Sequence, residues 1–299
     1  MSYRISPYKS IAEEIRDTLN EQNNKAIRSL NDMDISIDER IHDARKRFKK
    51  IRGAIRLAGY CIPKKSYSQM NQLYRDMGHK LAPLRDSWVK LKNLSQLLEE
   101  IQNGHEKSNY HSFFELLQVE YTKTKEEFRQ KDIPAQVNEV LAKQSDKILE
   151  LPVKNTAPEQ VIKGMNKIYV QGKKANAVAL KKQTPENLHE WRKRVKYLWY
   201  HTRLIRNIWK PVMKGYRNSL DDVSDYLGDR HDIDVLIYRL NQVFDLSNPA
   251  FSDFMEVVQH RKASLTEKAF RQGSKHYIEK PKAFSKRLLK YWELETEKA

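Results

Sequence analysis

The sequence is poor in the residues that build covalent, metal-bound or membrane-spanning sites. Its 299 residues contain one cysteine, Cys61, which excludes an intramolecular disulfide and a multi-cysteine metal site and fits a reducing compartment. The N-terminus lacks the apolar core of a secretory signal, and no apolar run approaches the roughly 20 residues that cross a bilayer. Walker loops, G-x-S-x-G elbows, dinucleotide glycine fingerprints and H-E-x-x-H pairs are also missing. We therefore expect a cytoplasmic protein without a membrane span, a metal ion or a cofactor.

The sequence has fewer acidic residues than basic ones. The chain carries 56 Lys+Arg against 39 Asp+Glu, which gives a formal net charge of +17 at pH 7. This excess predicts attraction to polyanions, whether nucleic acid, an anionic membrane or polyphosphate, but does not choose among them. With 39% hydrophobic residues and five tryptophans, the chain can build a folded core and is not a disordered basic tail.

Glycine is scarce as well. There are nine glycines, helical periodicity recurs almost everywhere, and alternating strand patterns are rare, so the sequence predicts an all-α fold. Breakers divide the chain into predicted helices, and Pro83 is expected to kink the third of them. The predicted helices are residues 7–30, 38–60, 65–102, 110–131, 135–149, 158–181, 185–209, 212–243 and 249–296.

Two segments far apart in the sequence are similar to one another. Residues 41–57, IHDARKRFKKIRGAIRL, align with residues 188–204, LHEWRKRVKYLWYHTRL, on the pattern H-x-x-R-K-R-x-K. Residues 81–94 then align with 227–240, and residues 128–130 align with 270–272. Because the order of the three elements is preserved, we predict two related helical bundles, residues 1–150 and 151–299, joined near residues 150–157.

The repeated helix carries a polar stripe beside its apolar one. In the first copy the stripe consists of His42, Arg45, Lys49, Arg52 and Arg56, and in the second of His189, Arg192, Lys196, Trp199 and Arg203. Each member follows an apolar position by one residue, so the stripe lies about 100° further round the helix and flanks a groove or an interface. It is about 21 Å long in the first copy, which suits an extended polymer.

Like charges at these spacings destabilise a helix. We therefore expect a bound anion, or acids from another helix, to neutralise the stripe. A solvated face is the simpler interpretation of a single charge run, but the recurrence of histidine and cations at the same positions argues against it.

These residues resemble the CHAD family, named for conserved histidines in an α-helical domain. The resemblance rests on H-x-x-R-x-x-x-K-K-x-R at 42–52, H-x-x-R-x-x-x-K at 189–196 and LG-x-x-x-D-x-D-V at 227–235, and it extends over nearly the whole chain. It implies one CHAD domain of two tandem four-helix bundles with pseudo-two-fold symmetry, a basic central groove or pore, and binding of inorganic polyphosphate. The E-x-E-x-K signature of a CYTH triphosphatase domain, which often accompanies CHAD domains, is matched only at 293–297, where glutamate replaces lysine. The chain thus resembles a stand-alone CHAD protein.

The resemblance assigns polyphosphate binding to specific positions of the repeated helices. These are His42, Arg45, Lys49, Lys50, Arg52, His189, Arg192 and Lys196, and the pattern shared by the two copies adds Lys46, Arg56, Lys193 and Arg203. The copies differ at His231, which stands where the first copy has Arg85, and His231 is expected to serve the second half instead. Asp86 and Asp232 are expected to give structural support by holding groove arginines. An anion would favour charged histidines and the neighbouring arginines would oppose them, so the sign of the histidine pKa shifts stays open.

The expected function is non-enzymatic binding of inorganic polyphosphate, which could direct the protein to polyphosphate granules. A helical RNA- or DNA-binding protein is the alternative, because the same charge serves nucleic acid and Tyr197, Trp199 and Tyr200 could stack on bases. A phosphoanhydride hydrolase ranks last, because that chemistry normally needs acidic side chains that hold a metal ion, and the stripe has none. Other polyanions stay possible partners, and the sequence leaves the oligomeric state open.

Overall fold

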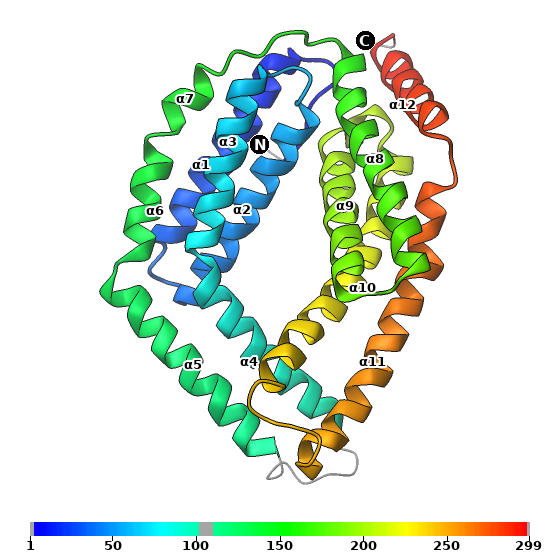
Figure 1. The fold of residues 1–299 in the computed structure, drawn as a ribbon. Coiled ribbons are helices and arrows are strands. Elements are labelled where there is room, and N and C mark those ends of the chain that lie inside the picture. Colours follow the sequence, from blue (N-terminus) through cyan, green and yellow to red (C-terminus); the bar gives the residue numbers. More distant parts are fainter. Residues whose placement is uncertain (1–2, 102–109, 298–299) are drawn as a thin grey trace.

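The structure is all-α, as the sequence predicts. The computed structural model describes residues 3–101 and 110–297, and these form helices joined by turns, with no β-strand among them (Figure 1). The first half contains α1 (Ile11–Asn31), α2 (Ile37–Leu57), α3 (Lys64–Lys80), α4 (Ala82–Ile101), α5 (His111–Gln130), α6 (Ile133–Ala142) and α7 (Ser145–Leu149). The second half contains α8 (Pro158–Lys181), α9 (Pro185–Leu204), α10 (Lys210–Leu240), α11 (Pro249–Gly273) and α12 (Pro281–Thr296). Within the described residues, none of the helices combines the length and the apolar character needed to cross a bilayer.

Several predicted helices are divided into shorter helices in the structure, because the apolar spacing of the sequence continues across the points where one helix ends and the next begins. The helix predicted at 65–102 is two helices, because Leu81 ends α3; its predicted end at residue 102 lies outside the described residues. Pro83 consequently stands in the first turn of α4, where its missing N–H costs nothing, and does not kink a longer helix. The prediction of one helix over 249–296 is also wrong. Pro281 begins α12 there, since proline cannot donate the hydrogen bond that a continuous helix would need.

The two repeated helices begin at well-formed caps. At the start of α2, the Ser36 hydroxyl accepts from the Glu39 amide at 3.3 Å, and the Glu39 carboxylate accepts from the Ser36 amide at 3.2 Å. At the start of α9, the Thr184 hydroxyl accepts from the Asn187 amide at 3.3 Å, and Pro185 occupies the first turn. Each cap satisfies N–H groups that have no partner within the helix. The caps therefore fix where the histidine stripes begin.

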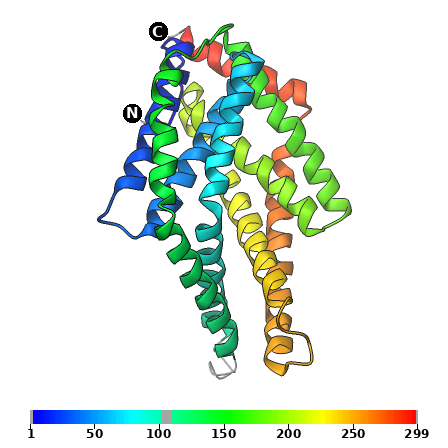
Figure 2. The same ribbon diagram turned by 60° about the vertical axis from the view of Figure 1, so that its left-hand side comes forward.

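The helices of the two halves pack in the same order. In the first half α1 packs on α2, α2 on α3 and α4 on α5, while α6 and α7 cover α1 (Figures 1 and 2). In the second half α8 packs on α9, α9 on α10 and α10 on α11, while α12 covers α8. The long α10 thus takes the place of both α3 and α4. The pseudo-two-fold axis and the boundary near residue 150 stay predictions.

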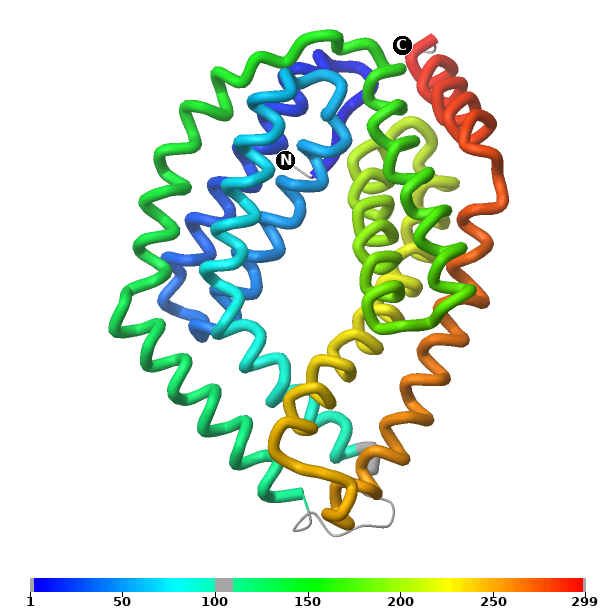
Figure 3. Tube along the Cα trace, viewed as in Figure 1, coloured from blue at the N-terminus to red at the C-terminus, as the bar shows by residue number. Residues whose placement is uncertain are grey.

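Two hydrophobic clusters join the halves, and each draws side chains from both. The larger includes Phe48 and Tyr74 from the first half and Trp191 and Trp292 from the second, all at most 2% exposed. The smaller forms where α4, α5, α10 and α11 converge at the lower end of Figure 3, with Phe113, Leu236, Phe251 and Phe254 fully buried. Burying a large apolar side chain is worth roughly 1.5–3 kcal/mol, so both clusters hold the halves against one another.

The helices α2 and α9 meet at a glycine. A Cβ at Gly53 would lie 3.0 Å from the Tyr200 Cβ and 3.0 Å from the Tyr3 hydroxyl oxygen, closer than side chains ordinarily pack. The Nε2 atom of buried His201 lies 3.1 Å from the Gly53 carbonyl oxygen. A Cβ at Gly164 of α8 would lie only 1.9 Å from the Leu57 carbonyl oxygen. These close approaches fix how the two repeated helices stand relative to one another.

Candidate functional site

Cations of both halves gather around Lys49 of α2. This side chain is exposed, yet the surrounding protein strips enough hydration to lower its pKa to about 7. Arg192 and Lys196 of α9 and Arg45 and Arg85 of the first half lower that pKa further by repulsion. An exposed lysine whose ammonium is partly stripped of water therefore stands among cations contributed by α2, α4 and α9. We call this set the central cluster: His42, Arg45, Lys49, Arg85, His189, Arg192, Lys196 and His231.

The histidines of the central cluster are neutral at pH 7. The rings of His189 and His231 lie 4.2 Å apart between centroids. Burial lowers the pKa of each to about 4, and further causes are the proximity of His231, which lowers the pKa of His189, and repulsion by Arg192, which lowers both. Burial and then Arg85 also lower the pKa of His42. The sequence left open whether the pKa values of these histidines are raised or lowered, and the structure lowers them. The neutral side chains offer N–H donors without adding charge.

Several buried donors of the central cluster have no acceptor. Arg192 Nε and Arg85 Nη1 lack a hydrogen-bond partner among the described residues, as does His189 Nδ1, which is a donor in one of the two neutral tautomers. A Cβ at Gly228 would lie 3.5 Å from both Arg192 Nε and Nη2, so this glycine leaves room for the guanidinium against α10. Because buried polar groups are normally satisfied, such donors mark a place where a ligand can supply oxygen acceptors.

A row of acids on α10 lies beside these cations. Asp221, Asp225, Asp229 and Asp232 recur every three or four residues, and Lys196 Nζ lies 3.6 Å from Asp221 Oδ1. Burial raises the pKa of Asp225, Asp229 and Asp232. Of this row the sequence analysis assigned only Asp232 to the site, although the spacing of all four is visible in residues 221–232. Acids from another helix therefore neutralise part of the second stripe.

The two aspartates expected to give structural support lie at the central cluster. Asp86 Oδ1 is 3.9 Å from Arg45 Nη2, and burial raises the pKa of this carboxyl. Asp232 is close enough to Arg192 and Arg85 for both to oppose the rise in its own pKa. Arg45 Nη1 also donates to the Gly78 carbonyl, which ties this arginine to the end of α3.

The match to a family model shows which protein family this chain is related to. The model described as the CHAD domain matches residues 11–241, which is most of the chain. The chain belongs to the CHAD family. The structure of PptA from Streptomyces chartreusis is similar, with a TM-score of 0.63 and 10% identity over 88% of this chain and 98% of that one. The crystal structure of the CHAD domain from the plant Ricinus communis is also similar, with a TM-score of 0.60 and 16% identity over 95% of this chain and 93% of that one. No curated protein matches the chain.

At these identities the similarity to solved structures shows the fold alone. Membership of the CHAD family associates the chain with polyphosphate binding in general. Which residues of this CHAD protein take part has to be argued from its own geometry.

Two of the predicted cations of this CHAD protein lie on a flank beside α3. Arg52 Nε and Arg56 Nη1 donate to Asn71 Oδ1 at 3.3 and 2.7 Å. The Arg56 guanidinium stacks 4.2 Å from the centroid of the Tyr197 ring. We call this set the Asn71 flank: Arg52, Arg56, Asn71 and Tyr197.

Two more predicted cations surround the N-terminal Tyr3. Lys50 Nζ lies 5.6 Å from the Tyr3 ring centroid, and the Arg203 guanidinium lies 4.7 Å from Trp199 and 5.8 Å from Tyr3. Lys50 is 6% exposed and makes no ion pair with a described residue; burial and then Arg47 lower its pKa to about 7. We call this set the Tyr3 flank: Tyr3, Arg47, Lys50, Trp199 and Arg203.

The remaining predicted cations lie apart from the central cluster. Lys46 is exposed and its Nζ is 3.8 Å from Asp43 Oδ1, one turn back on the same helix. Lys193 is likewise exposed and pairs with Glu190. The shared motif thus contains a solvated pair in each copy, beside the cations that face the other half.

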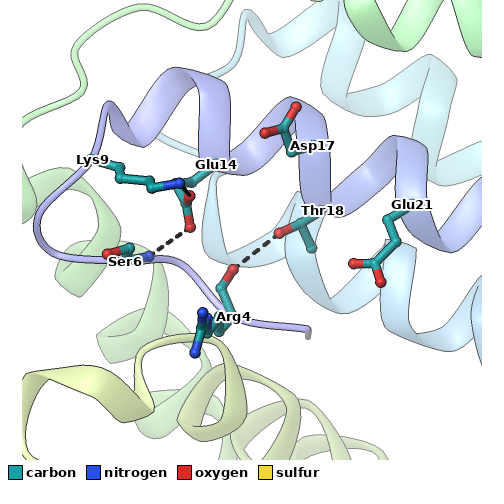
Figure 4. A pocket seen from close by; sticks show the side chains of 7 residues that line it. All are labelled: Arg4, Ser6, Lys9, Glu14, Asp17, Thr18 and Glu21. Carbon is teal, nitrogen blue, oxygen red and sulfur yellow. Dashed lines mark hydrogen bonds and ion pairs between the residues drawn. The ribbon is translucent and has the colours of Figure 1, made fainter. Parts of the chain in front are cut away.

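The small pocket beside α1 does not suit a polyanion. Its lining includes the carboxylates of Glu14, Asp17 and Glu21 against the cations Arg4 and Lys9 (Figure 4). Its volume is about 70 Å³. Among the residues that the structure describes, no three His, Cys, Asp or Glu side chains are grouped so as to hold a metal ion.

Proposed function

We propose that this CHAD protein binds inorganic polyphosphate at the central cluster and does not cleave it. The observation that carries the proposal is the meeting of α2 and α9 cations around Lys49, beside buried donors that lack acceptors. Polyphosphate has many phosphate oxygens and no bases. A site of arginines for bidentate contacts and lysines for mobile point charges meets that need.

The flanks support an extended ligand over a single phosphate. The Asn71 flank and the central cluster share the stripe of α2, and the Tyr3 flank continues the stripe of α9 through Trp199 to Arg203. Lys196 Nζ lies 4.3 Å from the Trp199 ring centroid, so cations stand on both sides of this tryptophan along α9. A chain of phosphates leaving the central cluster would meet further cations along either helix.

The aromatic side chains argue against nucleic acid. Trp199 is 9% exposed and Tyr200 is 3% exposed, while the face of Tyr197 is covered by Arg56. Base stacking needs an open aromatic face. The rings that could have stacked on bases are thus engaged by cations or packed in the core, and a ligand without bases fits better.

A phosphoanhydride hydrolase is less favoured for a geometric reason. Such enzymes bring carboxylates together on a metal ion beside the phosphates. The acids of α10 instead stand in a row, at spacings that separate neighbouring Cβ atoms by about 5–6 Å along one helix face. We therefore assign this row the role of limiting the net charge of the free site.

The test is a competition. Long-chain polyphosphate and RNA of equal total charge are titrated against the protein at roughly physiological salt, and polyphosphate chain length is followed on gels with magnesium or manganese. We expect polyphosphate to displace RNA and to keep its length. Preferential binding of RNA would overturn the ligand, and shortening that scales with active protein would overturn the non-enzymatic role. In cells, we expect the protein to collect at polyphosphate granules.

Binding should weaken as the pH rises from 6 to 9. Lys49, with a pKa of about 7, loses its charge over this range in the free protein, and a bound polyanion favours the charged form. Lys50 of the Tyr3 flank also has a pKa of about 7, so uptake of up to two protons corresponds to at most about a hundredfold per pH unit above pH 7. Burial raises the pKa values of Asp86, Asp225, Asp229 and Asp232, so on acidification these carboxylates lose their charge at a higher pH than ordinary aspartates, which strengthens binding further.

Calorimetry in two buffers with different ionisation enthalpies measures that proton uptake. The matched control is Lys49→Arg, which keeps the charge but does not titrate in this range. It should bind with a flatter pH profile than the native protein. Identical profiles for the two proteins would show that Lys49 is not the titrating group.

A further inference from the structure

A second cavity lies on the other side of α10 from the acidic row. It is open to solvent on one side and has a volume of about 500 Å³, within the range of small-molecule sites. Leu180 and Gln183 at the end of α8, Arg230 of α10, and Gln259, Lys262 and Phe270 of α11 contribute to its lining. Arg230 is two residues from Asp232, a rotation of about 200° on a helix, so this cavity is separate from the central cluster.

Beside the cavity, Arg230, Lys262 and Asp234 form a largely buried triad that carries a net positive charge. Asp234 pairs with both Arg230 and Lys262, the latter at 3.0 Å, and the three side chains are between 9% and 14% exposed. Two cations against one carboxylate leave a net charge of about +1. Glu267 also lines the cavity, but it is exposed and forms no ion pair with either cation. A largely buried charge is costly unless a counter-ion accompanies it.

Arg230 has a donor free for that counter-ion. The residue is 8% exposed, and its Nε atom has no hydrogen-bond partner among the described residues. The lining also includes an apolar wall formed by Leu180 and by Phe270, whose ring stacks on Trp191 at 4.9 Å between centroids. Cations and apolar side chains in one cavity fit a ligand that has both a charged group and an apolar body.

We propose that this cavity binds a small organic monocarboxylate, with its carboxylate on Arg230 and Lys262 and its aromatic or aliphatic body against Phe270 and Leu180. The net charge of about +1 on the triad of Arg230, Lys262 and Asp234, together with the exposed carboxylate of Glu267, matches a monoanion better than a phosphate monoester dianion. The planar guanidinium of Arg230 can present its Nε edge to a carboxylate oxygen. The proposal does not depend on polyphosphate binding, because the two sites share none of these residues.

The experiment uses the full chain with benzoate, phenyl phosphate and uncharged benzamide as probes, at about 150 mM salt to suppress non-specific attraction to a basic protein. Calorimetry and ligand-observed NMR should give millimolar or tighter binding of benzoate, and at least tenfold weaker binding of benzamide. Benzoate binding should persist with saturating polyphosphate. Preference for phenyl phosphate or benzamide, or no binding of benzoate, would overturn the proposal.

Variants locate the site. Lys262→Met keeps the pair of Arg230 and Asp234 and should weaken benzoate at least tenfold. Phe270→Leu tests the apolar wall and should weaken benzoate several-fold. The matched control is Lys268→Met, an exposed position on the same helix, which should bind as the native protein does. Equal losses in Lys262→Met and Lys268→Met would show that benzoate responds only to overall charge, and the proposal would fail.

Discussion

Replacing Lys49 and Arg192 together by glutamine should weaken the binding of long-chain polyphosphate by about a hundredfold. A charge-assisted contact is worth about 1.5–3 kcal/mol, and after a polymer slides to recover part of two such contacts, roughly 3 kcal/mol is lost. Lys49 and Arg192 repel one another, while Arg192 also attracts the carboxylates of Asp225, Asp229 and Asp232. Because relief of the repulsion offsets the loss of that attraction, the melting temperature of the free double variant should change little. Titration and thermal melts on the same preparations measure both quantities.

The choice of residues matters for this test. Arg45 would be a poorer target, because it also binds the Gly78 carbonyl and lies near Asp86, so its loss would disturb α3 and α4. The control is Lys174→Gln/Lys268→Gln, which removes the same charge at exposed positions of α8 and α11 and should bind almost normally. Native affinity in a folded Lys49→Gln/Arg192→Gln protein would remove the repeated helices from the site. Loss of affinity together with melting would mean that the cations stabilise the fold instead.

Affinity for polyphosphate should fall at least about a hundredfold between roughly 50 and 200 mM salt. Each neutralised phosphate releases a counter-ion, and slopes of about −0.7 to −0.9 per contact apply to nucleic acids, which we use as a guide for six or more contacts. The Lys49→Gln/Arg192→Gln protein should show a slope shallower by about two contacts. Titrations at four salt concentrations give both slopes. Affinity that stays nearly constant over this range would rule out a site made of many ionic contacts.

Much of the fold was predictable because helical periodicity and caps are local properties. The all-α class is confirmed, and the bounds 158–181 of α8 agree with the sequence prediction. The break before Pro281 was missed because apolar spacing continues across it. Spacing reports which side chains share a face and does not report where a chain turns.

The site was predictable in part for the same reason. The stripes on α2 and α9 were read from spacing, but the packing of the helices decides which members face the other half. Lys46 and Lys193 belong to the shared motif, yet they pair with acids three residues earlier on their own helices, Asp43 and Glu190. Those acids are aligned in the two copies, and this feature could have separated the solvated lysines from the others. Arg85 was missed because its role depends on how α4 approaches α2.

The contact at Gly53 has a consequence for how such proteins are compared. The separation between the two cationic stripes is fixed where α2 meets the Tyr200 ring, and no charged group takes part in that contact. A larger residue at this position would move the stripes apart while leaving every ligand-binding side chain in the sequence. Two relatives with the same charges could then differ in the ligand that they hold, and a comparison of surface potential calculated on a shared backbone would not reveal it. Residue size at an uncharged helix crossing therefore belongs among the determinants of selectivity.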